Sequence, residues 1–398
     1  MKVLCVNAGS SSLKFQLYDM PAEISIISGY VEKIGAADSF YTIKYEGKKT
    51  ETAKPIKDHA EAAKIMLEEL VNYGAVKDLE EIRGVGHRVL HGGEKYAKSV
   101  VIDEQVLKDI KDLTKLGPLH HPGNIAGIKA MQKALPNATQ VAVFDTAFHQ
   151  TIPKVQFMYP VPMEWYEKYG VRKYGFHGSS HKYITETMQK ILKKKDINLI
   201  ICHIGSGASI SAVKSGKCFD TTMGITPLAG LMMGTRSGDI DPSILEYVCK
   251  EIGMNISEVT NELNKNSGLL GISGHSDSRD VEQEAAYGDE WAQLALKMYN
   301  DRVASFIARY YIELDGDVDA IVFTAGVGEN GSEAREAIIK KLAPLGLEID
   351  EEVNNKVAGF KEIHEGIISS DNSKVPIYVE PTNEELMIIR DTYEICNK

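Results

Sequence analysis

Several short polar segments place an ionisable side chain beside an apolar run, and three of them contain glycine, which lets the backbone approach a ligand. Two of them carry arginine, Arg88 in residues 86–93 and Arg236 in residues 234–242. The others are residues 144–149, 174–181 and 381–385. Guanidinium groups bind carboxylate and phosphate bidentately, and a protonated imidazole can donate to a phosphoryl oxygen. A single such residue is more often structural, but their number favours a site for an anionic substrate.

A Gly/Ser turn near the start of the chain could bind phosphate. The apolar run Val3 to Val6 predicts a buried strand, and the alternation after the turn predicts a second one. Ser10 and Ser12 offer hydroxyl and backbone donors, and Lys14 adds a positive charge. An ordinary polar hairpin is the alternative interpretation.

A second stretch, residues 199–213, repeats this layout of strand, turn and strand. His203 stands where Asn7 stands in the first copy, and the residues Gly205, Ser206 and Gly207 form the second turn. Two copies half a chain apart indicate a duplicated domain. Such hairpins could hold a polyphosphate from both sides of a cleft.

Composition limits the class of protein. A chain of 398 residues fits two domains, and 43% hydrophobic with 25% charged residues is typical of a soluble globular protein. A net charge of −11 disfavours nucleic acid and anionic membranes as partners. The five scattered cysteines suggest thiols in a reducing compartment, and no apolar run is long enough to span a bilayer.

Strands that alternate with helices predict an α/β architecture with a domain boundary near residue 150. In the first half we expect a strand over residues 140–144 that carries Asp145 at its carboxyl end, and a loop over 119–124 in which Asn124 caps the next helix. In the second half we expect Ser180 to cap a helix, a break at Gly288 in a helix over 282–314, and a loop over 325–330.

The motifs as a whole resemble those of the acetate kinase family over essentially the full chain. They occur in the family's order and spacing, and they read NAGSSSLK, GHRVLHGG, DTAFH, YGFHGSSHKY, MGTRSGDIDP, TAGVGEN and PTNEE. The resemblance implies duplicated actin-like (ribonuclease H-like) domains that face each other across a nucleotide cleft. One would comprise residues 1–150 plus 385–398, and the other residues 151–384. It also implies reversible, direct in-line phosphoryl transfer from ATP to acetate by a cytoplasmic homodimer.

The resemblance further implies roles for individual residues. Arg88 and Arg236 would hold the carboxylate and the transferring phosphoryl group, His177 would donate to that group, and Asp145 would help to set its geometry. Asn7 and Glu384 would belong to the shell of Mg²⁺, with Mn²⁺ as a possible substitute. Residues on the phosphate and nucleotide side would be Ser10, Ser12, Lys14, His203, Gly205, Ser206, Gly207, Asp277, Arg279, Gly326, Gly328, Glu329 and Asn330.

The acid substrate would contact Arg88 and His120, while its methyl group would lie among apolar side chains. These side chains would be Leu90, Leu119, Phe176 and Pro227. Departures from the family pattern are Ser206, where Asn is usual, a segment 274–280 that is one residue shorter, and His121, Gly123 and Gly331. The alternatives are a kinase for propionate or butyrate and an actin-like nucleotide switch, which would need no carboxylate-binding arginine pair.

Overall fold

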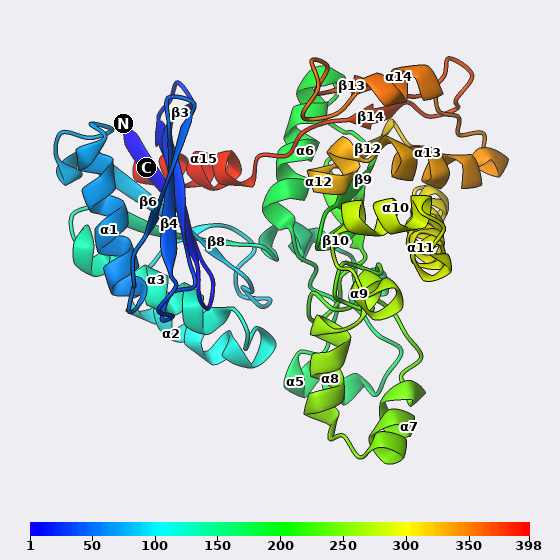
Figure 1. Ribbon diagram of the computed structural model, residues 1–398, viewed down its shortest axis with the longest axis horizontal. Helices are drawn as coiled ribbons and strands as arrows, with labels where there is room; N and C mark the ends of the chain where they lie inside the picture. The colour runs from blue at the N-terminus through cyan, green and yellow to red at the C-terminus, as the bar shows by residue number, and fades with distance from the viewer. The chain divides into compact units, whose positions relative to one another are not determined.

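The computed structural model describes residues 1–398 and divides them into two compact units. Unit 1 comprises Met1–Gln150 and Asn383–Lys398, and unit 2 comprises Thr151–Thr382 (Figure 1). The C-terminal helix therefore returns to the N-terminal sheet. Our sequence-based boundaries at 150 and 384 remain the proposed limits of two actin-like domains.

Unit 1 is built on an eight-stranded mixed sheet with the strand order β5-β4-β3-β2-β1-β6-β8-β7. Its strands are β1 (Lys2–Ala8), β2 (Leu13–Asp19), β3 (Ile24–Glu32), β4 (Phe40–Tyr45), β5 (Lys48–Ala53), β6 (Ile82–Val89), β7 (Val100–Val101) and β8 (Thr139–Phe144). Its α-helices are α1 (His59–Asn72), α2 (Glu104–Asp112), α3 (His121–Ala134) and α15 (Glu384–Cys396).

Helices cover both faces of the unit 1 sheet. On one face, Val85 of β6 joins a core with Met66 of α1 and Met131 of α3. On the other face β6 carries glycine, and a Cβ added at Gly86 would lie 2.6 Å from the Ile388 side chain of α15. Successive strand residues point to opposite faces, so α15 packs opposite α1 and α3.

Unit 2 contains a six-stranded mixed sheet with the strand order β11-β10-β9-β12-β14-β13. Its strands are β9 (Leu199–Ile204), β10 (Ala208–Lys214), β11 (Lys217–Thr221), β12 (Ala320–Thr324), β13 (Gly366–Ile367) and β14 (Ile377–Val379). Its α-helices are α4 (Lys154–Phe157), α5 (Met163–Tyr169), α6 (Gly178–Ile191), α7 (Ser243–Ile252), α8 (Ile256–Lys265), α9 (Gly268–Ser273), α10 (Ser278–Ala286), α11 (Glu290–Glu313), α12 (Ala325–Asn330), α13 (Ser332–Lys341) and α14 (Glu351–Lys356).

The two sheets share one topology. In unit 1, β1 pairs antiparallel with β2 and parallel with β6, which pairs parallel with β8. In unit 2, β9 pairs antiparallel with β10 and parallel with β12, which pairs parallel with β14. In each unit a third antiparallel strand follows on the hairpin side, β3 or β11. The predicted α/β class and the duplication of the strand–turn–strand motif are confirmed.

Three local predictions were wrong: two about the residue that caps a helix and one about a loop. Helix α3 begins at His121, before Asn124, whose side chain instead bridges two strand ends. Helix α6 begins after His177, so Ser180 lies inside its first turn and bonds sideways. Residues 325–330 form the short helix α12. For Asn124 and Ser180 a tertiary hydrogen bond prevails over the local capping preference.

The predicted break at Gly288 is confirmed, because α10 ends at Ala286 and α11 begins at Glu290. Gly288 has φ +97°, a left-handed conformation that costs glycine little. The Asp289 side chain then accepts a hydrogen bond from the Ala292 N–H, which caps α11.

Candidate active site

In unit 1 the carboxyl ends of parallel strands bring Arg88 and Asp145 together. Val89 of β6 lies opposite Phe144 of β8, so the neighbouring polar residues meet at one sheet edge. The Arg88 guanidinium donates from Nε and Nη2 to the two Asp145 oxygens at 2.9 and 2.6 Å. Asp145 is fully buried, whereas the Arg88 side chain is 26% exposed. Asp145 thus orients an arginine that still has N–H groups available for an anion.

The packing of α15 on β6 brings Glu384 to the same edge. Cβ atoms added at Gly84 and Gly86 would meet Cys396 and Ile388, so β6 and α15 run in opposite directions. That register places the start of α15 beside Arg88. Burial by itself would lower the pKa of Arg88. The negative charges of Asp145, Glu384 and Glu385 outweigh that effect and raise the pKa.

The positive charges near Glu384 do not offset the cost of burying its carboxylate. Burial raises its pKa to about 7; Arg88 and Lys14 oppose the shift, whereas Asp145 and Glu385 add to it. Asn7 shares the α15-facing side of β1 with Cys5, whose pKa is raised by burial and then by Glu385. A cation near Glu384 would relieve this repulsion. One carboxylate and one amide, completed by water and phosphate oxygens, suit Mg²⁺.

The first Gly/Ser turn is held from behind by α3. The Asn124 amide donates to Ala8 O at 2.8 Å and accepts from Leu90 N at 3.2 Å, which joins the ends of β1 and β6. A Cβ at Gly123 would overlap the Gly9 backbone, so the departure to glycine at 123 permits this close packing. Ser10 and Lys14 are exposed, and Lys14 pairs across the hairpin with Asn7.

The predicted acid-binding residues of unit 1 lie around the start of α3. Leu90 is buried, while Leu119 is 53% exposed and His120 is exposed. A Cβ at Gly117 would touch both Leu90 and the buried ring of His121, at 3.0 Å from each. His121 bonds through Nδ1 to Ile110 O at 2.8 Å, so this second departure has a structural role.

In unit 2 three histidines and two serines form one network. His177 precedes α6 with φ +57°, a strained conformation for a residue with a side chain. Its ring stacks on His203 with centroids 4.2 Å apart. The Ser209 hydroxyl lies 2.9 Å from His177 Nδ1 and 2.8 Å from His181 Nε2. Ser180 bonds to His203 Nδ1 at 2.7 Å.

This network allows His177 to donate without carrying a charge. When the Ser209 hydroxyl donates to Nδ1 of His177, that ring keeps its proton on Nε2, and His181 donates to the serine oxygen. The Nε2 atom lies on the side of the second glycine turn, 3.5 Å from an added Gly207 Cβ. The sequence did not single out Ser209 or His181 because their connection to His177 is tertiary.

Arg236 lies beside His177 at that turn. A Cβ at Gly207 would lie 3.1 Å from Arg236 Nη2, so a larger residue would displace the guanidinium by a few tenths of an ångström. The other guanidinium nitrogen, Nη1, donates to Pro227 O at 2.8 Å. Phe176, directly before His177, is buried. The two cationic or donor groups of unit 2 therefore converge on one turn of the β9–β10 hairpin.

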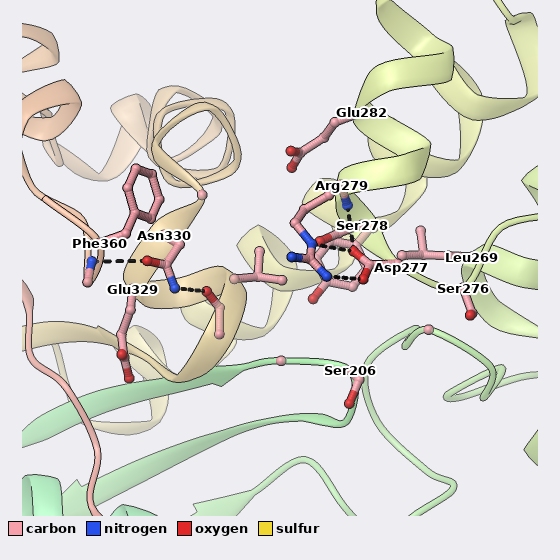
Figure 2. Close-up of a pocket in the computed structure, with 17 residues that line it drawn as sticks. Ser206, Leu269, Ser276, Asp277, Ser278, Arg279, Glu282, Glu329, Asn330 and Phe360 are labelled. Carbon is pink, nitrogen blue, oxygen red and sulfur yellow. Dashed lines mark hydrogen bonds and ion pairs between the residues drawn. The ribbon is translucent and has the colours of Figure 1, made fainter. Parts of the chain in front are cut away.

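A cavity of about 850 Å³ opens beside this hairpin in unit 2 (Figure 2). It has the size of a site for a drug-sized ligand or cofactor. It unites segments that are far apart in sequence, and most of the predicted nucleotide residues of unit 2 line it. These are Gly205, Ser206, Asp277, Arg279, Gly326, Glu329 and Asn330. His203, Gly207 and Gly328 lie outside its lining.

Two of these lining residues also have internal roles. The Glu329 carboxylate accepts from Ala325 N at 2.8 Å and Thr382 N at 3.1 Å, and so fixes the start of α12. The Asn330 amide donates to Gly326 O and accepts from Gly359 N, which holds the 359–360 segment at the cavity rim. The sequence had assigned both residues to nucleotide contact alone.

Arg279 and Asp277 bind each other at the start of α10. Arg279 donates from Nε and Nη2 to the two Asp277 oxygens at 3.0 and 2.5 Å. The Arg279 side-chain and backbone hydrogen bonds lower the pKa of Asp277 to about 2. Glu282 also lines the cavity, although the sequence did not point to it.

Comparison with known proteins gives a consistent result. The model of the Acetokinase family matches residues 2–390. An acetate kinase from Clostridium novyi is 52% identical and one from Bacillus subtilis 50% identical, each alignment covering 99% or more of both chains. Among solved structures, a propionate kinase from Francisella tularensis has a TM-score of 0.93 at 45% identity. Porphyromonas gingivalis acetate kinase has a TM-score of 0.93 at 42% identity, and both alignments cover 99% of each chain.

None of the helices has the length and apolar character needed to cross a membrane.

Proposed function

Because the chain belongs to the acetokinase family, we propose that it transfers a phosphoryl group reversibly from ATP to acetate, forming acetyl phosphate and ADP. The observation that carries the proposal is the pair of arginines in their two settings. Arg88 is oriented by buried Asp145, and Arg236 lies with His177 at the β9–β10 turn. Such groups suit a carboxylate and a phosphoryl group.

The nucleotide binds in the 850 Å³ cavity of unit 2 in this proposal. Ser206 follows β9, and Gly326 lies in α12 directly after β12, so the Ser206 hydroxyl and the Gly326 N–H group face the phosphates at the carboxyl ends of parallel strands. Ser206 supplies a hydroxyl where the family usually has an amide.

The reaction needs positioning and charge stabilisation more than proton transfer. Acetate is already ionised near neutral pH, so no general base is required. Arg88 and Arg236 stabilise the negative charge on the transferring group, and His177 donates from Nε2 while Ser209 fixes its tautomer. The phosphoryl group then passes from ATP to acetate in one in-line step, which inverts the configuration at phosphorus. Retention with a chiral γ-phosphoryl donor would instead indicate an intermediate on an acidic side chain.

Asn7 and Glu384 are the residues that would hold Mg²⁺, with Mn²⁺ as a possible substitute. The cation, when bound, neutralises charge on the phosphate oxygens. The raised pKa of Glu384, caused first by its burial, supports a cation at this point. Asp145 orients Arg88 through direct hydrogen bonds.

We also propose that the enzyme prefers acetate to longer carboxylic acids. Leu90, Leu119, Phe176 and Pro227 are the apolar residues proposed for the methyl group. One methylene in an apolar pocket is worth about 10- to 200-fold in discrimination. We expect acetate to be preferred over propionate by around tenfold, although one similar structure is that of a propionate kinase. A panel of acids assayed for acyl phosphate decides between the two.

The test of the main proposal is the pair of variants Arg88→Ala and Arg236→Ala. Each removes a charge-assisted partner of the phosphoryl group and should cost about 3 kcal/mol in transition-state stabilisation, roughly a hundredfold in rate. The measurement is acetyl phosphate formation, with circular dichroism as the folding control. Near-normal turnover by either folded variant would refute its assignment.

We also propose a cytoplasmic homodimer. The five cysteines form no disulfide bond, which is compatible with a reducing compartment. Size-exclusion chromatography with light scattering measures the oligomeric state.

A further inference from the structure

The cavity of unit 2 changes character along its length. At one end lie Gly205, Ser206 and Gly234, where the Ser206 hydroxyl is a donor and there is no carboxylate. Figure 2 shows the Asp277–Arg279 pair above Ser206 and Glu282 still farther from it. An anion is therefore favoured at the glycine end and repelled at the Glu282 end.

Glu282 points into the cavity from α10 and has acceptor capacity to spare (Figure 2). It forms no hydrogen bond or ion pair with the protein, because nearby Arg279 is bound to Asp277. Burial raises the pKa of Glu282, and the charges of Glu333 and Asp277 add to that rise. A ligand group that meets this carboxylate must be a hydrogen-bond donor and not an anion or a lone acceptor.

We propose that Glu282 accepts a hydrogen bond from the exocyclic 6-amino group of the purine and so selects ATP over 6-oxo purine nucleotides. This inference rests on the proposed function, in which ATP occupies this cavity. With the phosphates at Ser206, the sugar lies near Asp277 and Arg279, and the base extends to Glu282. The 6-amino group of adenine donates to a carboxylate, whereas the 6-oxo group of inosine or guanosine is an acceptor and meets it unfavourably.

The ratio of kcat/KM for ATP to that for ITP tests the contact between Glu282 and the 6-amino group. Acetyl phosphate formation is followed with ATP and with ITP, whose base has an oxo group at C6 and a hydrogen on N1 in place of the 6-amino group of adenine. Hydrogen bonds to a charged group contribute about 1.5 to 3 kcal/mol, so kcat/KM for ATP should exceed that for ITP roughly 10- to 100-fold. In Glu282→Gln the amide can offer either an oxygen or an N–H group, and the ratio should fall to about threefold or less. Glu284→Gln is the matched control on α10, removes the same charge outside the cavity lining, and should keep the wild-type ratio.

Calorimetric binding of ADP and IDP gives a second measurement that does not depend on turnover. A wild-type ATP to ITP ratio near one overturns the inference. An equal loss of ATP and ITP activity in Glu282→Gln also overturns it, since a contact with the sugar or a general electrostatic effect would behave in this way. If no donor yields acetyl phosphate, the proposed function fails instead.

Discussion

At the scale of single residues, hydrogen bonds between side chains fix the groups assigned to chemistry. Asp145 holds Arg88 by hydrogen bonds from Nε and Nη2, and Ser209 lies between His177 and His181. The first arrangement leaves Nη1 of Arg88 for a ligand, and the second fixes the orientation of the His177 ring. Preorganised donors of this kind need little rearrangement when negative charge develops.

A buried histidine in the same strand as Arg88 links stability to pH. His87 is 2% exposed and bonds through Nε2 to Gln140 Oε1 at 2.8 Å. Burial lowers its pKa from 6.5 to about 4. Between these values the unfolded chain binds a proton that the folded chain does not bind, so stability is retained above pH 6.5 and falls as the pH drops toward 4.

We therefore expect acidification to destabilise the wild type more than His87→Gln, which keeps an amide partner for Gln140 but cannot titrate. At about 1.4 kcal/mol per pH unit, the difference between pH 7.5 and 4.5 should approach about 2 to 3 kcal/mol in the free energy of unfolding. Urea unfolding at both pH values measures it. Identical pH dependence in the two proteins would show that His87 does not contribute.

At the scale of elements, the contact between β6 and α15 positions Glu384. Glycine at 84 and 86 lets the helix approach the strand, and the helix then begins beside Arg88. The register between an early strand and the last helix thus determines where the proposed metal ligand lies. A substitution in β6 that shifts α15 should therefore alter the proposed Mg²⁺ site without contacting it.

Gly86→Ala is expected to disturb this contact. Its methyl group would lie 2.3 Å from Thr392 Oγ1 and 2.6 Å from the Ile388 side chain. Overpacking of this kind costs about 1 to 3 kcal/mol in stability. Because Ile388 is one helical turn from Glu384, we also expect weaker apparent Mg²⁺ affinity in the acetyl phosphate assay.

Gly84→Ala is the matched control, since its methyl group would meet Cys396 Sγ at 2.7 Å near the far end of α15. It should lower thermal stability with a smaller change in the Mg²⁺ requirement. Equal effects of both substitutions on Mg²⁺ affinity would contradict this view of the helix.

At the scale of the whole molecule, one topology occurs twice but carries different groups. Unit 1 carries the Arg88–Asp145 pair, and unit 2 carries the 850 Å³ cavity and the histidine network. The strand–turn–strand motif is kept, whereas the residue at the end of the first strand is Asn7 in one copy and His203 in the other. Duplication therefore supplied a scaffold on which the side chains diverged.

We expect ADP alone to protect unit 2 more than unit 1, since all residues that line the cavity belong to unit 2. Hydrogen exchange of the full chain should slow around residues 205–207, 276–282 and 326–331. A ligand at 100 times its Kd adds about 2.7 kcal/mol to the stability of the folded state that binds it. Protection confined to unit 1 would place the nucleotide elsewhere.

The sequence by itself determined the α/β class, the repeated strand–turn–strand motif and the family. These depend on local patterns, such as apolar runs, glycine-rich turns and motifs in a fixed order, which can be read without knowing where the chain folds back. The strands β1, β2, β9 and β10 accordingly lie where the patterns predict them. Arg88 and Asp145 could also be singled out, because Arg88 lies in a glycine-flanked segment and Asp145 follows an apolar run.

Only the tertiary structure decided how these groups are held. Asn124 was expected to cap a helix, but its amide bonds to Ala8, 116 residues away in sequence. Ser180 bonds to His203, and Glu282 reaches the cavity from a helix with no motif of its own. The physical reason is that a polar side chain satisfies its hydrogen bonds with whatever packing brings near. Those partners depend on strand order and helix register, which local sequence does not encode.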